Sequence, residues 1–290
     1  MALGNLAQRF LVAVVAVPIL LLVVYFHRPE PTWALIFVGS LLAMHEFFAM
    51  TLPAEDRRPA VVMGAIAVAA FYWLDGLVLS PYHRDIPLAL VTFAYLNGST
   101  VALIAAVIVP GLYYLFRFRD IPSVAGRYAA TVAGIVYAGF LATFLAKLKL
   151  AGGGDFVLIV LLIAWVADTG GYFAGRFLGK SKLYEAVSPK KTWAGAYGGL
   201  IGSFAGVAVL KLVHAHFLSW LDVALLAIPG GILGQLGDLA ESLIKRSVGV
   251  KDSGALLPGH GGILDRIDAV LFIAPYAYVY LLITHGPLLR

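Results

Sequence analysis

About nine apolar runs, each close to the length of one membrane crossing, constrain this 290-residue chain more than any other feature. A bilayer core of roughly 30 Å needs about 20 apolar residues per helical crossing. The runs lie near residues 10–26, 31–50, 60–80, 88–116, 127–148, 154–178, 195–219, 222–245 and 267–285. Hydrophobic residues make up 61% of the chain and charged residues 13%. We therefore predict an all-α polytopic membrane protein with about nine transmembrane helices.

Prolines and flanking residues help to place the ends of these runs. The second and third runs separate at Pro53–Pro59, and Pro110 predicts a kink or an early end in the overlong fourth run. The first run follows Arg9 and has features of a signal peptide. It is longer than a usual signal core, and His27-Arg28-Pro29 is a poor cleavage site, which favours a retained helix.

Lysine and arginine gather in alternate loops between the runs. They are Arg57, Arg58, Arg117, Arg119, Lys180, Lys182, Lys190, Lys191, Lys245, Arg246 and Lys251. Cytoplasmic loops carry such an excess, so we predict a cell (inner) membrane protein with its N-terminus and residues 241–268 in the cytoplasm. The net charge of +5 follows this topology and does not indicate a nucleic-acid partner. The chain has no cysteine, which excludes disulfides and thiolate metal sites.

The segment 241–268 concentrates charge between the last two apolar runs. It contains Glu241, Lys245, Arg246, Lys251, Asp252, His260, Asp265, Arg266 and Asp268. Charge at the end of a membrane helix is costly unless it is paired, solvated or bound to something. Gly261 and Gly262 allow close backbone approach to a ligand at the start of the last helix. The segment therefore suggests a site for a polyphosphate and its metal, with His260 as a phosphate contact or a merely solvated side chain.

Polar residues also follow helical faces inside the apolar runs. Asp168, Gly171, Tyr172 and Gly175 fall at i, i+3, i+4 and i+7, which is one face of a helix. Helix packing alone would explain the glycines. It would not explain an aspartate at membrane depth, so we predict that Asp168 faces a site.

A second stripe lies on the run 222–245. Its members are Gly234, Asp238, Glu241, Ser242 and Lys245. Lipid cannot solvate such a stripe, so it must face other helices or a water-filled cavity. An internal Asp–Lys pair is one interpretation. Two acids and a hydroxyl on one face near the cytoplasmic end also fit oxygen ligation of a hard cation.

Two further groups of residues admit both a functional and a structural interpretation. Ser188 followed by Pro189 predicts a helix N-terminus, which would place Lys190 and Lys191 in its first turn. Cations are disfavoured there, so a bound anion would resolve the conflict; otherwise these are topology lysines. His45, Glu46 and Asp75 are interpreted as solvated helix ends.

The polar residues divide the chain near residue 120. We expect N-terminal transmembrane helices over 1–120 and a catalytic transmembrane domain over 121–290, with a cytoplasm-facing polar cavity in that C-terminal half. The N-terminal runs are nearly pure Ala, Val, Leu, Ile and Phe.

The order of residues in 242–268 resembles the signature of the phosphatidate cytidylyltransferases, also called CDP-diacylglycerol synthases. The matching positions are Ser242, Lys245, Arg246, Lys251, Asp252, Gly254, Leu257, Pro258, His260, Gly261, Gly262, Asp265, Arg266 and Asp268. Three more stretches also look like family motifs: Asp168–Tyr172, Ser188–Thr192 and Gly237–Ser242. The resemblance covers the C-terminal half. The N-terminal runs match only in being hydrophobic.

This resemblance implies an enzyme that joins CTP and phosphatidate into CDP-diacylglycerol and pyrophosphate with Mg²⁺. By this resemblance, Asp238 and Asp265 are expected to be the metal ligands. The residues expected to bind phosphate groups are Lys245, Arg246, Lys251, His260 and Arg266. The other expected substrate contacts are Asp168, Lys190, Lys191, Ser242, Gly261 and Gly262. The expected partners are CTP, phosphatidate and membrane lipids, with no nucleic acid. A homodimer and a second metal ion stay open.

A membrane transporter of an anionic substrate is the alternative function. Transporters also place polar residues in broken helices, but they usually show paired repeats, which this sequence does not have. A receptor-like membrane protein would not need the charged segment 241–268.

Overall fold

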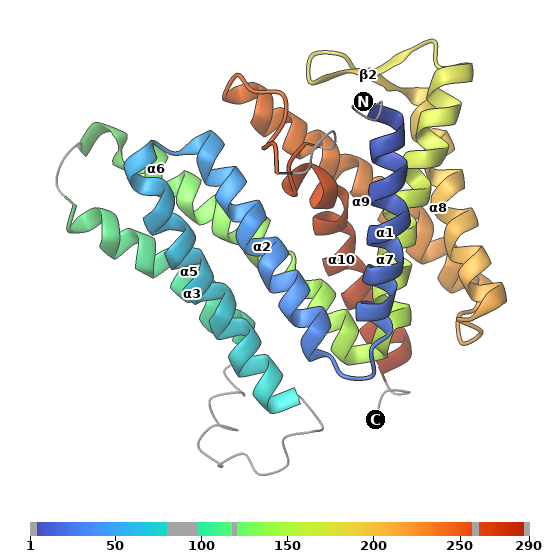
Figure 1. Cartoon of the computed structure of the whole chain (residues 1–290), viewed down its shortest axis with the longest axis horizontal. Helices are drawn as coiled ribbons and strands as arrows, with labels where there is room; N and C mark the ends of the chain where they lie inside the picture. The colour runs from blue at the N-terminus through green and yellow to red at the C-terminus, as the bar shows by residue number, and fades with distance from the viewer. Residues whose placement is uncertain (1–4, 80–97, 118–120, 257–260, 287–290) are drawn as a thin grey trace. The chain divides into compact units, whose positions relative to one another are not determined.

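The computed structural model describes residues 5–79, 98–117, 121–256 and 261–286, and these are almost entirely helical (Figure 1). The helices are α1 (Asn5–Tyr25), α2 (Glu30–Thr51), α3 (Ala54–Leu79), α5 (Gly98–Leu115), α6 (Ile121–Gly134), the π-helical η1 (Ile135–Phe140), α7 (Thr143–Leu178), α8 (Trp193–Val213), α9 (Trp220–Ser247) and α10 (Leu264–His285). Two short strands, β1 (Lys182–Tyr184) and β2 (Ser188–Thr192), form a hairpin between α7 and α8.

The helices bear out the predicted class, an all-α protein of membrane type. Among the described residues, five helical stretches are long and apolar enough to cross a membrane. They are Glu30–Thr51, Ile121–Leu178, Trp193–Val213, Trp220–Ser247 and Leu264–His285. The stretch Ile121–Leu178 contains two of the predicted crossings, 127–148 and 154–178. The length and composition of the described helices therefore do not confirm the predicted number of nine crossings.

A glycine break inside α7 separates these two predicted crossings. Gly152 and Gly153 leave helical geometry, and Gly153 has φ +71°, a conformation that glycine adopts without steric cost. The break falls between the predicted runs 127–148 and 154–178. The predicted boundary between the second and third runs is found at Pro53, since α2 ends at Thr51 and α3 begins at Ala54, while Pro59 lies inside α3. The helix α5 continues past Pro110 to Leu115.

The chain forms two compact units. Unit 1 consists of Met1–His27, Lys147–Asp252 and Asp265–Arg290, and unit 2 of Arg28–Ala146 and Ser253–Leu264. The predicted functional division at residue 120 remains a prediction.

Unit 2 packs α2 against α3, α6 and η1, and α3 against α5. Met44 and Phe48 of α2 are fully buried, and glycines on neighbouring helices make room for them. A Cβ atom at Gly64 or Gly139 would overlap Met44, and one at Gly134 would overlap Phe48. Close packing therefore explains these small residues without a ligand.

Glu46 of α2 corrects one prediction from the sequence. It was interpreted as a solvated helix end, but its side chain is buried and its carboxylate accepts hydrogen bonds from Ser253, Ile263 and Leu264, all in unit 2. The neighbouring His45 is exposed, as predicted. The side chain of Asp75 is outside the described residues.

In unit 1, glycine faces bring α7 and α8 together. A Cβ at Gly170 would overlap the carbonyl oxygen of Gly198, and one at Gly202 would overlap that of Val166. The predicted glycines also lie at this contact: a Cβ at Gly171 would be 3.2 Å from the carbonyl oxygen of Gly195, and one at Gly175 would be 3.3 Å from Thr192 Oγ1. Helices with small residues at their contact approach closely, so the packing interpretation of these glycines holds. The helix α8 packs in turn against α9.

The hairpin corrects the prediction of a helix beginning at Ser188-Pro189. Residues 188–192 form a strand that pairs antiparallel with β1, and α8 begins at Trp193. Proline fits an edge strand as well as a first helical turn, because its fixed φ suits both. The N-cap is Thr192, whose Oγ1 accepts from the Gly195 N–H at 3.1 Å. Lys190 and Lys191 therefore lie before the N-cap and not in the first turn of a helix, so the predicted conflict with the helix dipole does not arise.

Candidate functional site

A cavity of about 430 Å³ lies within unit 1, between α7, the hairpin, α8, α9 and α10. Its lining changes character along the helices. Near the hairpin it is polar, with Lys190, Lys191 and Arg176, and farther along it is apolar, with Ile163 and Ile273. The site therefore offers a charged region and an apolar region within one enclosure.

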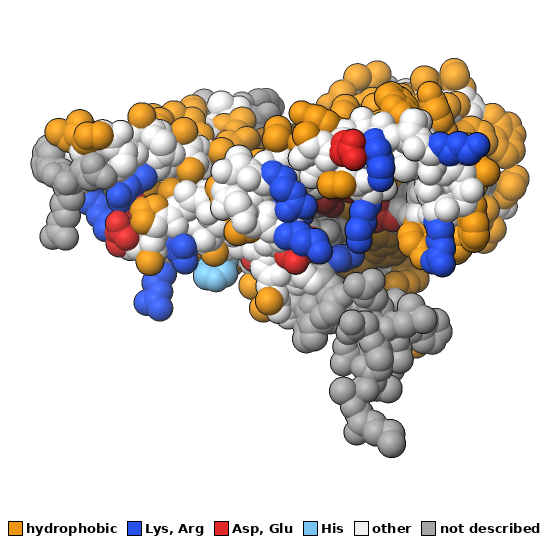
Figure 2. All heavy atoms as spheres, turned by 90° about the horizontal axis from the view of Figure 1, so that it is seen from above, with side chains coloured by type: hydrophobic (Ala, Val, Ile, Leu, Met, Phe, Trp, Pro, Cys, Tyr) orange, Lys and Arg blue, Asp and Glu red, His pale blue; other side chains and the backbone are white. Residues whose placement is uncertain are grey.

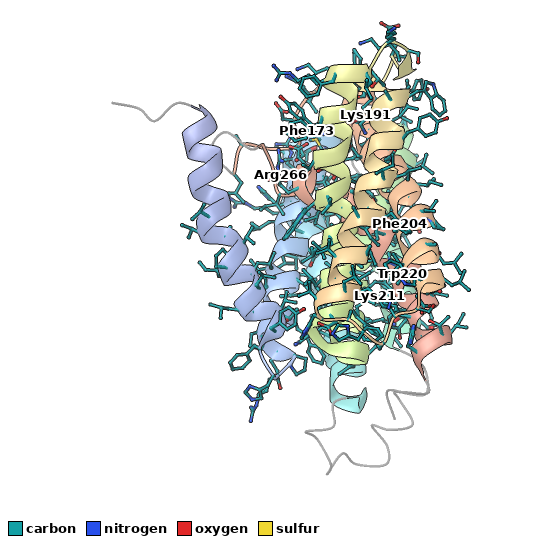
Figure 3. The ribbon with its side chains drawn as sticks, turned by 90° about the vertical axis from the view of Figure 1, so that its right-hand side faces the viewer. Phe173, Lys191, Phe204, Lys211, Trp220 and Arg266 are labelled. Atoms are coloured by element: carbon teal, nitrogen blue, oxygen red, sulfur yellow. The ribbon has the colours of Figure 1, made fainter. Side chains whose placement is uncertain are left out.

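The charged region lies at one end of unit 1. Figure 3 shows Lys191 and Arg266 toward one end, while Lys211 and Trp220 lie toward the other. Figure 2, which looks onto the face that bears the hairpin, shows Lys and Arg side chains around a hollow that contains acidic side chains. Both charge signs are therefore accessible from this face.

The predicted face of α7 does line the cavity. Asp168, Gly171, Tyr172 and Gly175 all contribute to its wall. Arg176, which was not among the predicted residues, also lines the wall and donates to the Tyr172 hydroxyl at 2.6 Å. Extending the spacing from Asp168 to i+8 would have found it.

An ion pair joins the hairpin to α9 at this cavity. Lys191 Nζ lies 2.6 Å from Asp238 Oδ2, and about one third of the Asp238 side chain is exposed. Ser242 Oγ, one turn further along α9, lies 3.4 Å from Asp238 Oδ1. The predicted stripe on α9 thus presents its aspartate to the cavity, in contact with one of the two predicted lysines.

Lys245 forms a second, more buried ion-pair group. Its Nζ lies 2.5 Å from Glu241 Oε2 and 2.6 Å from Asp265 Oδ1, and Glu241 is 1% exposed. An internal Asp–Lys pair was one of the two interpretations of this stripe, and the aspartate of the stripe itself, Asp238, pairs with Lys191 of the hairpin. Lys245 pairs with Glu241 of the stripe and with Asp265 of α10. The pair also places Asp265, the first acid of α10, against α9.

Three aspartates from three helices interact electrostatically. The carboxylate of Asp168 experiences the charges of Asp238, Lys191 and Arg266, and that of buried Asp268 experiences those of Asp238 and Asp168. Asp268 was noted in the sequence without a role. Its position one turn after Asp265 was the signal that could have assigned it to the site.

The described residues contain no set of three His, Asp or Glu side chains arranged to hold a metal ion. Asp238 and Asp265 each contact a lysine instead. The donor chemistry nevertheless fits a hard divalent cation, because carboxylate oxygens are the ligands that Mg²⁺ prefers.

The remaining predicted residues are distributed as follows. Arg246 is exposed and donates to the carbonyl oxygens of Val250 at 2.9 Å and Val187 at 3.4 Å, which ties α9 to the hairpin segment. Lys251 is exposed. His260 lies outside the described residues.

Gly261 and Gly262 belong to unit 2. Gly261 has φ +79°, a backbone conformation that favours glycine. At Gly262 a Cβ atom would overlap the Glu46 carboxylate. The backbone N–H groups that follow, of Ile263 and Leu264, donate to Glu46. The contact of these glycines with substrate remains a prediction.

The fold and the cavity place the chain among polytopic membrane proteins with a charged site at one end of a helical unit. Comparison with known proteins gives the family. The chain matches the model of the Cytidylyltransferase family over residues 7–284, and it belongs to that family.

Curated relatives bear the name that the sequence resemblance implied. The phosphatidate cytidylyltransferase of Staphylococcus epidermidis is 46% identical over 133 residues, which are 46% of this chain and 51% of that protein. That of Brucella suis is 45% identical over 150 residues, 51% of this chain and 55% of that protein. That of Staphylococcus haemolyticus is 33% identical over 250 residues, 86% of each chain. The first two alignments thus span about half the length of those relatives.

Proposed function

We propose that this protein transfers the cytidylyl group of CTP to phosphatidate, giving CDP-diacylglycerol and pyrophosphate. One observation carries the proposal: a cavity in a membrane-type helical unit combines lysines, aspartates and an apolar wall. Nucleotide phosphates need the charged part, and a lipid substrate needs an apolar path. Membership of the Cytidylyltransferase family favours this reaction over transport of an anion.

The chemistry requires no dedicated base. A phosphate monoester has a second pKa near roughly 6, so phosphatidate is largely dianionic at neutral pH. One of its oxygens forms a bond to the α-phosphorus of CTP. The bond from that phosphorus to the oxygen bridging the β-phosphorus breaks, and pyrophosphate leaves with this oxygen. The protein's task is to position two polyanions and to stabilise the charge on the leaving group.

The lysines of the hairpin suit the polyphosphate. Lys190 and Lys191 line the cavity, and Lys191 already contacts an oxyanion, the carboxylate of Asp238. A phosphate oxygen would replace that carboxylate in the complex. Lys245, Arg246, Lys251, His260 and Arg266 are proposed as further phosphate contacts, with Ser242, Asp168, Gly261 and Gly262 completing the substrate site.

Asp238 and Asp265 would hold Mg²⁺. When bound, the ion supplies positive charge against the phosphates of CTP. Asp238 faces the cavity, and Asp265 is held by Lys245 on the adjacent turns of α9. Asp168 and Asp268 add negative potential that favours a cation beside Asp238.

We further propose that the protein lies in the cell (inner) membrane with this cavity open to the cytoplasm. The supporting observation is that the hairpin and the end of α9 carry lysines and arginines, as cytoplasmic segments do. The nucleotide would then reach the site from water and the lipid from the bilayer.

A direct assay tests the proposal. Purified protein is incubated with Mg²⁺, phosphatidate and CTP labelled at the α-phosphate, and both pyrophosphate and labelled lipid are measured. We expect both products in equal amounts. Diacylglycerol in place of phosphatidate is the matched control, since it lacks the attacking phosphate. Absence of labelled lipid with phosphatidate would refute the proposal.

A further inference from the structure

The carboxylate of Glu46 is the centre of a buried hydrogen-bond group in unit 2. Its Oε1 accepts from the Ile263 N–H at 3.0 Å, and its Oε2 accepts from the Leu264 N–H at 2.8 Å and the Ser253 hydroxyl at 3.2 Å. Both oxygens are therefore used. Glu46 is 5% exposed, so water does not replace these bonds.

Two glycines of the segment 253–264, Gly254 and Gly262, lie directly against the Glu46 carboxylate. A Cβ atom at Gly254 would lie 2.7 Å from Glu46 Oε1, and one at Gly262 would overlap Oε2 and Ser253 Oγ. Real Cβ atoms do not come so close to an oxygen. These two glycines of the charged segment thus have an explanation inside the protein: they leave space for one glutamate side chain.

The two N–H donors lie at the N-terminus of α10. Leu264 is the first residue of α10, and Ile263 precedes it. The first N–H groups of a helix have no partner within it, and a carboxylate satisfies them well because it also interacts favourably with the helix dipole. Glu46 of α2 therefore caps the N-terminus of α10, although it lies 217 residues before Ile263 in the chain.

We propose that Glu46 is a positioning residue for the reaction. By holding Ser253, Ile263 and Leu264, its carboxylate fixes both ends of the segment 253–264 and the start of α10. The next two residues in the chain are Asp265 and Arg266, the proposed metal ligand and phosphate contact. Glu46 itself touches neither substrate nor metal. Its catalytic effect rests on the proposed function, but its structural effect does not.

Amide hydrogen exchange tests the structural effect without any substrate. In Glu46→Gln the side chain keeps its shape but loses its charge and one acceptor oxygen. Exchange in peptides covering 261–266 should rise at least about 10-fold, because bonds to a charged acceptor are the stronger ones. His45→Gln is the matched control, since His45 is the adjacent, exposed residue of the same helix. It should leave exchange at these residues unchanged.

Steady-state kinetics with CTP and phosphatidate test the catalytic effect. We expect Glu46→Gln to lower kcat between about 10-fold and 100-fold, as displacement of a catalytic group by about 1 Å does. The KM for CTP should rise by a smaller factor than kcat falls, because Glu46 binds no substrate and acts on CTP only through the position of Arg266. Glu46→Asp, which keeps the charge, should recover part of the lost kcat. Ser253→Ala, which removes one of the three bonds, should give a smaller change in the same direction and serves if Glu46→Gln does not fold.

The outcomes separate this proposal from the proposed function. If the unmodified protein forms no CDP-lipid, the proposed function fails, and exchange still decides whether Glu46 holds the segment. Unchanged exchange in Glu46→Gln and Ser253→Ala would overturn the positioning role. So would faster exchange with normal kcat, because the hydrogen bonds would then serve stability alone.

Discussion

Lys191 of the hairpin and Asp238 of α9 form an ion pair with 2.6 Å between Nζ and Oδ2, at the wall of the cavity. The pair joins two residues with separate predicted roles: Lys191 was expected to bind phosphate and Asp238 to bind the metal ion. A lysine that can exchange a carboxylate for a phosphate oxygen needs little rearrangement to bind its ligand. In the proposed complex the same exchange would free Asp238 to bind a cation.

Lys191→Ala should therefore weaken use of CTP. We expect the KM for CTP to rise at least about 10-fold, since a charge-assisted contact to phosphate is lost. Lys190→Ala should act in the same direction. Lys180→Ala removes the same charge from an exposed position of the same segment and is the control. Equal kinetics for all three variants and the unmodified protein would return Lys190 and Lys191 to a role in topology alone.

The sequence predicted the helices better than the contacts between them. Most apolar runs coincide with helices, because membrane thickness sets their length. The run 222–245, for example, falls within α9, whereas residues 88–97 of the fourth run lie outside the described residues. The spacing of Asp168 and Tyr172 gave a cavity wall, because a helix repeats its faces at fixed intervals. Such rules act over a few turns of one element.

Contacts between distant segments were outside the reach of these rules. The burial of Glu46 depends on residues more than two hundred positions later in the chain, and no local pattern marks it. The strand at Ser188–Thr192 was misassigned for a different reason. Proline and a preceding serine are compatible with both a helix start and an edge strand, and pairing with β1 decides between them.

Lys149 gives a prediction about stability. Its buried ammonium donates to the carbonyl oxygens of Val24 at 2.7 Å and Phe26 at 2.8 Å, at the C-terminal end of α1. Lys149→Met keeps the length of the side chain and leaves both acceptors without this donor. We expect a loss of about 1–3 kcal/mol, seen as a lower midpoint of thermal unfolding in detergent. An unchanged midpoint would show that α1 does not depend on this contact. Lys147→Met, two residues earlier in α7, is the comparison.

The proposed orientation is testable by labelling single cysteines, since the chain has none of its own. Lys180→Cys and Lys251→Cys place thiols at exposed positions of the segments expected in the cytoplasm. His216→Cys places one between α8 and α9, across the predicted crossing. In intact cells an impermeant reagent should label only position 216. Labelling of positions 180 and 251 under these conditions would contradict both the orientation and the cytoplasmic site.

The metal assignment predicts the largest loss of activity. Asp238→Asn and Asp265→Asn should each lower kcat at least about 10²-fold, as loss of a key electrostatic stabiliser does. Because the two aspartates would serve one ion, the double variant should be little worse than either single variant. Chelation with EDTA should abolish turnover, and added Mg²⁺ should restore it.

Asp252→Asn supplies the matched control for this metal assignment, because it makes the same change at an exposed acid in the same charged segment. Its kcat and its dependence on Mg²⁺ should equal those of the unmodified protein. For Asp265 the ion pair with Lys245 adds a second effect, since loss of the charge leaves Lys245 with Glu241 alone. Raising Mg²⁺ separates the two effects. A weakened ligand set should recover activity at high Mg²⁺, whereas a displaced Lys245 should not. Near-normal activity of either single variant at low Mg²⁺ would remove that aspartate from the metal site.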